Sequence, residues 1–330
     1  MLYSVDHIDF NHNEMEFYKF AIVPINKLDG LHKKAIFNYS KDLINNDVSL
    51  NFNTKEPLEF IDNSEKVFIS VHSSIFHFVV DSLQTIIYHY RYNNNTKFII
   101  DCSQIKNNTE LHKEFFGILK EFLNFLKIDY HFVDSSLCDI ILNNVFYYNH
   151  FPKTEVYLRD LIKVLKDCYE IDSSIVPNKK IYTSRSIVDI DRLKEKKIYS
   201  KISKYDSDIR LENEEILKDF LIKKSFHIID FENISFKDRL NLLNETKLIS
   251  GVTGSGLLGQ LFMQEGQTVV EYVTMLRDGL NLNGFQLHQH YNAVSYIKKH
   301  FYMGVYNDRN AHNLIKTIKN NKTLMALINE

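Results

Sequence analysis

A glycine-rich stretch in the second half of the chain is the segment best suited to hold an anionic ligand. It runs from Leu248 to Phe262, and its pattern predicts a buried strand that passes through Gly251, Gly254 and Gly256 into an apolar helix. Glycines let the backbone approach a ligand closely, and the N–H groups at a helix N-terminus carry partial positive charge that suits a diphosphate. Tight packing of a helix on a sheet also selects small residues, so the turn by itself is equally consistent with a structural role.

Two arginines upstream of this turn carry permanent positive charge. Arg185 follows Ser184 at the end of a predicted strand, where a guanidinium can meet phosphate oxygens. Its planar fork matches phosphate geometry, and a leaving diphosphate needs such neutralisation when no metal supplies it. A solvated salt bridge is the alternative for Arg185. Arg210 precedes Asn213 and Glu214, for which ordinary complementation of a helix dipole is an equally good explanation.

His77 and Asp81 form a polar pair on an otherwise apolar predicted helix in the first half of the chain. Side chains four residues apart project from one face of a helix, so the two can contact each other. A pair of this kind can take a proton from a substrate hydroxyl. An isolated His/Asp pair is more often a structural hydrogen bond, so this spacing does not by itself establish a role in chemistry.

Strands and helices alternate through both halves of the chain, which predicts α/β architecture with mostly parallel sheets. The expected strands are 66–71, 97–100, 130–133, 140–148, 180–183, 227–230, 247–250 and 268–272. The expected helices are 75–90, one that begins at Thr109, 155–169, 212–224, 235–245, 257–263 and one or two over 310–329.

Length and composition predict two globular domains. The 330 residues exceed what one hydrophobic core usually organises, and 44% apolar with 25% charged residues is typical of a folded protein. We place the boundary near a turn at residues 150–153. The expected domains are an N-terminal Rossmann-like domain (1–152), a C-terminal Rossmann-like domain (153–305) and a helical tail (306–330) that packs back on the N-terminal domain.

The composition argues against several kinds of partner. Lys and Arg total 40 against 42 for Asp and Glu, and this net charge of -2 creates no general attraction for nucleic acid or anionic lipid. The chain start does not resemble a signal peptide, and no apolar run approaches a membrane span, so we expect a cytoplasmic protein without a membrane segment. Cys102, Cys138 and Cys168 are widely spaced, which favours buried thiols over disulfides or a zinc site.

The order of these motifs resembles glycosyltransferase family 61. That family carries S-R, R-x-x-N-E, a Glu shortly before S-F-x-E-Q, G-x-H-G-A-G-L-x-N-x-x-F and V-V-E, with a His-x-x-x-(Asp/Glu) helix upstream. The corresponding segments here are Ser184-Arg185, Arg210 to Glu214, Glu232 with Ser235-Phe236, the glycine turn, Val269-Val270-Glu271, and His77 with Asp81. The main likeness spans roughly residues 180–273.

The resemblance implies a fold and an activity. The fold is GT-B, in which two Rossmann-like doubly wound domains face a cleft. The activity is inverting transfer of a sugar from a nucleotide-sugar donor, typically a UDP-sugar, to a hydroxyl of a glycan or glycolipid acceptor, with no metal or other cofactor. The family includes xylosyl- and O-linked N-acetylglucosaminyltransferases. Because this sequence lacks the secretory anchor of animal and plant relatives, we expect a bacterial or viral enzyme of surface polysaccharide biosynthesis.

The resemblance also gives each motif residue an expected role. Asp81 is the expected catalytic base, oriented by His77. The expected donor-binding residues are Arg185, Arg210, Asn213, Glu214, Thr253, Gly254, Ser255, Gly256, Gln260 and Glu271. Arg185 and the amides of 254–256 would hold the diphosphate, and Glu271 would lie near the ribose. Thr253, Ser255 and Gln260 stand where the family has His, Ala and Asn, and Thr and Gln keep hydrogen-bonding groups.

Two other functions stay open from the sequence. A catalytically silent protein that binds a nucleotide-sugar or glycan would keep the fold after losing the family histidine at position 253. A metal-dependent GT-A transferase would bind a cation through a DxD motif, and DxD occurs at 189–191 and 206–208. Neither DxD follows a clear strand, and His288 and His290 have no third ligand nearby, so we assign no metal ion.

Overall fold

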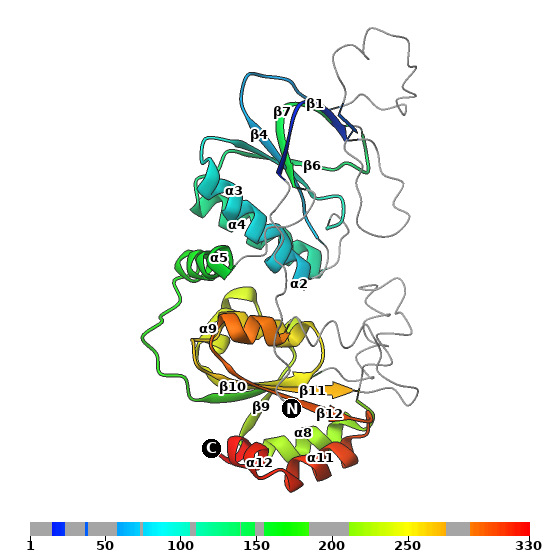
Figure 1. Ribbon diagram of the computed structural model, residues 1–330, viewed down its shortest axis with the longest axis vertical. Coiled ribbons are helices and arrows are strands. Elements are labelled where there is room, and N and C mark those ends of the chain that lie inside the picture. Colours follow the sequence, from blue (N-terminus) through cyan, green and yellow to red (C-terminus); the bar gives the residue numbers. More distant parts are fainter. Residues whose placement is uncertain are drawn as a thin grey trace. The chain divides into compact units, whose positions relative to one another are not determined.

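The computed structural model describes residues 15–23, 37–38, 58–72, 75–105, 110–138, 140–148, 155–184, 211–274 and 291–330. The chain divides into two compact units, Met1–Cys168 and Tyr169–Glu330, and each contains one sheet with helices packed on it (Figure 1). Most strand pairs in both sheets are parallel. The described part of the chain is therefore an α/β protein, as the alternation of strands and helices predicts.

The sheet of unit 1 has the strand order β2-β1-β7-β4-β5-β6, and β3 pairs with β7. Its strands are β1 (Met15–Val23), β2 (Phe37–Asn38), β3 (Leu58–Phe60), β4 (Lys66–Ser70), β5 (Lys97–Asp101), β6 (Tyr130–Val133) and β7 (Ile140–Tyr148). Its helical segments are α2 (Ile75–His77), η1 (Phe78–Leu83), α3 (Gln84–Tyr92), α4 (Glu110–Phe125) and α5 (Glu155–Cys168). Among the described strand pairs of this sheet, only the two that β1 forms, with β2 and with β7, are antiparallel.

The central strands of unit 1 are buried on both faces. Side chains of a strand alternate between faces, so neighbouring apolar residues meet different partners. Phe98 meets the ring of His89 in α3, with ring centroids 5.6 Å apart. Phe68 and Ile99 instead belong to a cluster with Val145. This burial explains why β4 and β5 read as continuous apolar runs in the sequence.

Helix α5 is fixed to unit 1. Arg91 of α3 binds Asp160 of α5 through two hydrogen bonds, Nε to Oδ2 at 2.7 Å and Nη2 to Oδ1 at 2.9 Å. The rings of Tyr88 and Tyr157 meet edge to face between the same helices. The compact units consequently divide after Cys168, later in the chain than the boundary expected after residue 152.

The sheet of unit 2 has the strand order β12-β11-β10-β8-β9, and its neighbouring strands are all parallel. Its strands are β8 (Lys179–Thr183), β9 (Phe226–Ile229), β10 (Thr246–Val252), β11 (Thr268–Thr274) and β12 (Phe301–Asn307). Its helical segments are α8 (Glu214–Ile222), η2 (Phe231–Asn233), α9 (Phe236–Asn244), η3 (Ser255–Phe262), α11 (Ala311–Asn320) and α12 (Lys322–Asn329), with a further helix over 291–297.

Helices cover both faces of the second sheet (Figure 1). Helices α8, α11 and α12 bury apolar side chains against one face, where Leu217, Leu314 and Ile328 join Tyr182 in a single core. Helices α9 and η3 contact each other on the opposite face, and η3 also contacts β10. The apolar faces of the tail helices α11 and α12 are therefore buried within unit 2.

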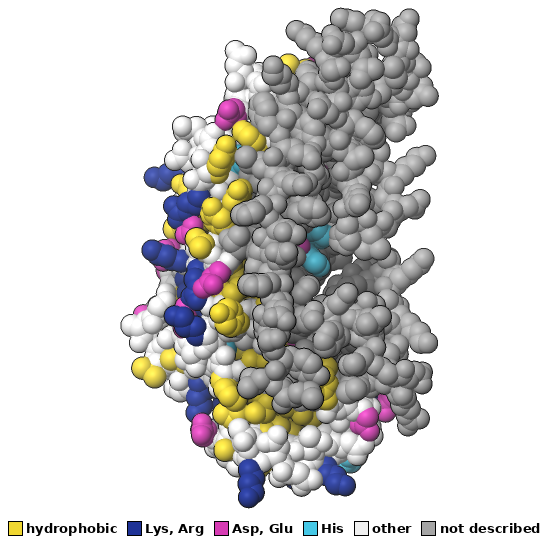
Figure 2. Space-filling model, in the orientation of Figure 1, with side chains coloured by type: hydrophobic (Ala, Val, Ile, Leu, Met, Phe, Trp, Pro, Cys, Tyr) yellow, Lys and Arg dark blue, Asp and Glu magenta, His cyan; other side chains and the backbone are white. Residues whose placement is uncertain are grey.

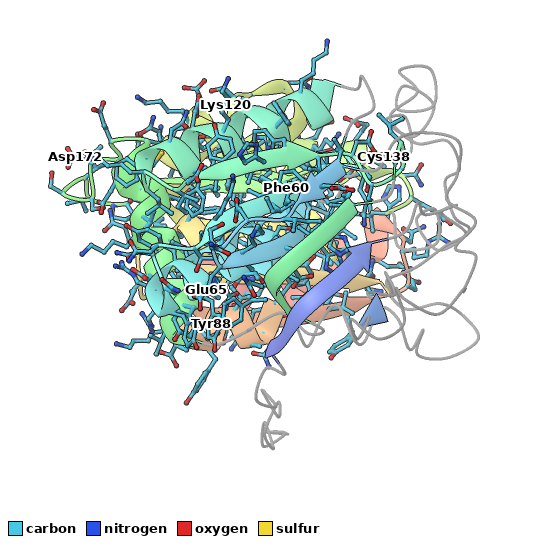
Figure 3. All side chains as sticks on the ribbon, turned by 90° about the horizontal axis from the view of Figure 1, so that it is seen from above. Phe60, Glu65, Tyr88, Lys120, Cys138 and Asp172 are labelled. Carbon is cyan, nitrogen blue, oxygen red and sulfur yellow. The ribbon has the colours of Figure 1, made fainter. Side chains whose placement is uncertain are left out.

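Parallel strands all point the same way, so their amino ends lie together along one side of the sheet and their carboxyl ends along the other. We call these sides the amino edge and the carboxyl edge. In unit 1, Glu65 precedes β4 and Cys138 follows β6, and these residues lie at opposite ends of the sheet in Figure 3. The predicted site residues Asp81 and Thr253 both follow strands. Asp81 lies in η1, in the helical stretch after β4, and Thr253 lies in the turn after β10, so both segments begin at a carboxyl edge. This edge is where ligands of α/β proteins bind.

The surface and the cysteines agree with the composition. In Figure 2, the basic side chains on the described part of that face alternate with acidic and apolar ones. No helix among the described residues has both the length and the apolar character needed to cross a membrane. Cys102 and Cys138 are buried, Cys168 is half-buried, and none of these three described cysteines forms a disulfide.

Two histidines are held neutral in the interior, one in each unit. Burial lowers the pKa of His89 to about 4 and that of His300 to about 4. His300 accepts a hydrogen bond at Nδ1 from the Gln267 N–H, at 3.1 Å, and its Nε2 lies 2.9 Å from the Gln260 carbonyl oxygen. Protonation of Nδ1 removes the first of these bonds.

Acid should therefore destabilise the protein. Both folded-state pKa values lie below the unfolded value of 6.5, so the unfolded chain binds more protons and stability falls as the pH drops from about 6.5 towards about 4. The loss is at most about 3 kcal/mol per histidine. Denaturant unfolding between pH 7 and 4.5 measures it. The variant His300→Gln should flatten the pH dependence of unit 2, whereas a variant of the exposed His227, His227→Gln, should leave it unchanged.

Candidate functional site

The glycine turn is tied to the end of strand β8. A Cβ atom on Gly251 would lie 2.2 Å from Thr183 Oγ1, and one on Gly256 would lie 2.9 Å from the same oxygen. Real Cβ atoms do not come this close to another heavy atom, so both positions exclude a side chain. Gly259 is similarly close to Leu243. Close packing on Thr183 therefore accounts for two glycines of the motif, and it fixes the path of the turn beside β8.

The turn lies at a topological switch point. The chain leaves β8 for β9 on one side of the sheet, then returns to β10 on the other side of β8 and continues outward to β11 and β12. Loops that leave β8 and β10 therefore diverge, and a crevice at this position is the usual ligand site of an open α/β sheet. The structure places Ser184 and the segment Thr253 to Gly256 here, because Gly251 pairs with Thr183.

The two arginines predicted to meet the diphosphate, Arg185 and Arg210, lie outside the described residues. Ser184 is the last described residue before Arg185. Its backbone N–H donates to the Ile229 carbonyl oxygen at 3.1 Å, so the chain is still paired with β9 at that point.

Glu214 is buried and holds the end of β8. Its Oε1 accepts a hydrogen bond of 2.6 Å from the Tyr182 hydroxyl, and its Oε2 lies 3.4 Å from Ser184 Oγ. Burial, and then the negative charge of Glu214, raises the pKa of Tyr182. The carboxylate thus faces the strand that leads to Arg185. Asn213, beside it, is exposed and left-handed (φ 57°), a conformation that asparagine tolerates better than most residues.

A second buried carboxylate holds the glycine turn. Glu271 in β11 is fully buried, and its Oε1 accepts a hydrogen bond of 2.6 Å from Thr253 Oγ1. Its Oε2 accepts a hydrogen bond from the hydroxyl of Tyr302 in β12. Burial, and then the charge of Glu271, raises the pKa of Tyr302. The Thr253 hydroxyl donates its proton to Glu271, so this hydrogen bond ties the turn to β11.

Gln260 is also buried, but its side chain contacts a different segment. Its Oε1 accepts a hydrogen bond from Ser295, and its carbonyl oxygen contacts His300. Gln260 thus joins η3 to helix 291–297 through Ser295 and to the segment that follows this helix through His300. The side chain of Ser255 lies outside the described part of the structure.

In unit 1, His77 and Asp81 contact each other as their spacing predicts. His77 Nδ1 lies 2.5 Å from Asp81 Oδ2. The side chain of Asp81 is 3% exposed, whereas that of His77 is 38% exposed. Asp81 lies in η1, a π-helical turn between α2 and α3, and such turns occur frequently at functional sites.

This pair also lies beside a switch point. The chain proceeds from β4 to β5 and β6 on one side, then crosses to β7 on the other side of β4. The helical segment with His77 and Asp81 begins directly after β4 and so starts at this position. The two units therefore place their predicted site residues at the same kind of position in their sheets.

Two residues missed by sequence reasoning support the pair. The ring of His72 packs on that of His77, with centroids 4.9 Å apart, and the His72 backbone N–H donates to Ser82 Oγ at 3.1 Å. Asp101 is fully buried, accepts a hydrogen bond from Ser70 Oγ at 3.1 Å, and holds the end of β4. In the sequence, only the positions of His72 and Asp101 at the carboxyl ends of β4 and β5 indicate that they could support a site.

No metal site emerges from the described residues, which contain no group of three or more His, Cys, Asp or Glu side chains able to hold an ion. The motifs at 189–191, 206–208 and 288–290 lie outside those residues.

Comparison with known families decides the class of protein. The sequence model of Glycosyltransferase 61 matches residues 75–270, more than half of the chain. The chain belongs to glycosyltransferase family 61. The matched region begins in α2, two residues before His77, and it includes Asp81 and the whole glycine turn, ending one residue before Glu271. Membership indicates a glycosyltransferase, which acts on a sugar donor and an acceptor. No curated protein sequence matches this chain.

The close approach of the turn to Thr183 can be tested with glycine variants. Gly251→Ala should destabilise the protein by about 1–3 kcal/mol, because its Cβ must displace Thr183. Gly117→Ala is the matched control: nothing lies within 4 Å of a Cβ there, and in helix α4 alanine should stabilise by up to about 1 kcal/mol. Urea unfolding measures both. Adding Thr183→Ala should restore part of the loss, and a Gly251→Ala protein of unchanged stability would contradict the packing described.

The Glu271 network gives a second test. Tyr302→Phe removes a donor to a buried carboxylate and should cost about 1–3 kcal/mol of unfolding free energy. Tyr306→Phe, at a half-exposed tyrosine on the same strand, should change stability by less than about 0.5 kcal/mol. Equal stabilities of the two variants, measured by urea unfolding, would show that the Tyr302 hydrogen bond contributes nothing.

Proposed function

We propose that the protein is an inverting glycosyltransferase of the GT-B type that transfers a sugar from a UDP-sugar to a hydroxyl of a glycan or glycolipid. The single observation that carries the proposal is the position of the glycine turn, beside the end of β8 at the switch point of an all-parallel sheet. Two separate sheets, each with its own switch point, fit GT-B better than GT-A. The GT-B proposal requires the two carboxyl edges to face each other.

The donor diphosphate would bind at the turn in unit 2. The first N–H groups of a helix have no partner within that helix, so the amides of Gly254 to Gly256 can donate to phosphate oxygens. Arg185 would supply the charge that neutralises the leaving group, and Glu214 would fix the end of the strand that precedes it. Glu271 is fully buried and supports the turn through its hydrogen bond with Thr253.

The acceptor would bind at the His77–Asp81 pair in unit 1. Inverting transfer needs one base, which takes the proton of the acceptor hydroxyl while the diphosphate leaves from the opposite side of the anomeric carbon. The pair combines a buried carboxylate with an accessible imidazole 2.5 Å away, which suits this step. We propose that neutralisation by Arg185 and the amides replaces a metal ion. The cytoplasmic location, the bacterial or viral origin and the role in surface polysaccharide synthesis stay predictions.

Nucleotide binding tests the donor site. UDP should raise the melting temperature, and excess EDTA should leave this shift unchanged. Arg185→Ala should weaken UDP binding by about 10- to 100-fold, since a hydrogen bond to a charged group contributes about 1.5–3 kcal/mol. Arg159→Ala, which removes an arginine bound to Glu155 in α5, is the matched control and should bind UDP normally. Unchanged affinity of the Arg185 variant in calorimetry would reject its assignment.

Turnover separates an enzyme from a binding protein. The purified protein is incubated with UDP-xylose, UDP-N-acetylglucosamine, UDP-glucose or UDP-galactose and a mixture of methyl glycosides, and UDP release is measured. Release of UDP with formation of a glycoside of inverted configuration supports the proposal. UDP binding without turnover of any donor supports a silent binding protein, and turnover that EDTA abolishes supports a metal-dependent enzyme.

A further inference from the structure

The geometry points to His77, rather than Asp81, as the base that takes the acceptor proton. We infer that Nε2 of His77 receives the proton, that Asp81 positions the imidazole through Nδ1, and that His72 fixes the plane of its ring. This inference rests on the proposed transferase function, and it reverses the roles expected from the sequence, where Asp81 was the base and His77 its orienting partner.

Accessibility distinguishes the two side chains. A base must come within about 2.6–3.2 Å of the proton donor in the substrate complex. The Asp81 side chain is 3% exposed, and its Oδ1 atom is buried, while Oδ2 contacts His77. The His77 side chain is 38% exposed. The imidazole is therefore the more accessible group for an acceptor hydroxyl, which must displace His77 to reach Asp81 Oδ2.

The hydrogen bond between Asp81 and His77 determines which ring nitrogen of His77 carries the proton. An ionised carboxylate can only accept a hydrogen bond, so the 2.5 Å contact with Asp81 places the imidazole proton on Nδ1. The lone pair of the neutral ring then lies on Nε2, at the other side of the ring. Asp81 is itself held in the helix, where the Thr85 hydroxyl donates to its carbonyl oxygen at 2.7 Å.

His72 holds the ring from one face. Its imidazole lies 4.9 Å from that of His77, at an interplanar angle of 33°, and its backbone N–H is bonded to Ser82 one residue beyond Asp81. The end of β4 is fixed in turn by Asp101, whose side chain binds Ser70 and whose carbonyl oxygen accepts from the Val71 N–H at 2.9 Å. Asp81 and His72 are two titratable groups that contact His77.

The transfer step balances with these roles. The acceptor O–H bond breaks and its proton goes to His77 Nε2, while the acceptor oxygen forms a bond to the anomeric carbon of the donor sugar. The bond from that carbon to the diphosphate oxygen breaks, and its electron pair leaves with UDP. The resulting imidazolium is stabilised by the Asp81 carboxylate until it returns its proton to water.

The variant His77→Asn discriminates between the two assignments. The Asn side-chain N–H₂ lies near the place of Nδ1 and can still donate to Asp81, but nothing replaces Nε2. If His77 is the base, kcat for transfer from a UDP-sugar that the wild type turns over falls by about 10²- to 10⁴-fold, with unchanged UDP affinity. If His77 only orients Asp81, His77→Asn keeps most of the wild-type kcat, and that result overturns the inference. Should His77→Asn lower the melting temperature, both proteins are assayed at a temperature at which the variant is fully folded.

A conservative variant tests the positioning role of Asp81. Asp81→Asn keeps a side-chain oxygen that can accept the hydrogen bond from His77 Nδ1, so it should retain part of kcat. Asp81→Ala removes that acceptor and should lower kcat further, with unchanged UDP affinity. Equal kcat values for the two folded variants overturn this role.

His72 variants test the contact between the rings. His72→Phe keeps an aromatic ring against His77 and should retain kcat, whereas His72→Ala should lower kcat by several-fold with little change in KM or melting temperature. Equal kcat values for the two variants overturn the role of His72.

Failure of this inference can be told apart from failure of the proposed function. If the wild type turns over none of the UDP-sugars, the transferase function fails and this inference falls with it. If the wild type is active and His77→Asn is equally active, the transferase function stands and only the assignment of the base fails.

Discussion

In each unit, buried carboxylates that accept hydrogen bonds at the carboxyl ends of parallel strands fix the positions of the candidate site residues. A carboxylate in the interior is costly unless donors surround it, so its position fixes the positions of those donors. Asp101 binds the side chains of Ser70, Ser103 and Ser135, and thereby joins the ends of β4, β5 and β6. Glu271 joins the end of β10 to β11 and β12. The loops that leave these strands therefore start from rigid positions.

The buried carboxylates of the two units contact different kinds of group. In unit 2 the carboxylates of Glu214 and Glu271 face inward, towards hydroxyl groups, and leave the backbone of the glycine turn as the group that can contact a ligand. In unit 1 the carboxylate of Asp81 faces an imidazole instead, so the pair can accept a proton as well as hold a position. The proposed sugar transfer assigns ligand binding through backbone amides to unit 2 and proton transfer to unit 1.

Long apolar runs made much of the fold predictable from the sequence. The strands 130–133 and 140–148 have the predicted bounds, and the helix expected over 75–90 runs to residue 92. Strands β1, β2, β3 and β12 and the helix 291–297 were not predicted. β12 reads as mixed polar and aromatic because it lies at the edge of its sheet and is partly exposed. The helix expected over 257–263 is a 3-10 helix that begins at Ser255, in a segment where Gly256 and Gly259 weaken α-helical preference.

The candidate site was predictable where its members are close in sequence. His77 and Asp81 meet as a four-residue spacing requires, and the glycines mark the turn. Tyr302 contacts Glu271 from 31 residues away, and only the register of β11 on β12 brings the two together. A single sequence does not contain that register, since parallel strands are paired by the fold and not by a local turn.

The C-terminal end of the chain is anchored at the amino edge of the second sheet. Lys180, at the start of β8, donates from Nζ to the Ile328 carbonyl oxygen at 2.9 Å, and Lys247, at the start of β10, contacts Glu330. The glycine turn leaves the same sheet at the opposite edge. A linker fused after Glu330 would thus emerge on the far side of unit 2 from the turn, so the protein can be attached to a sensor surface by this end with the turn left uncovered.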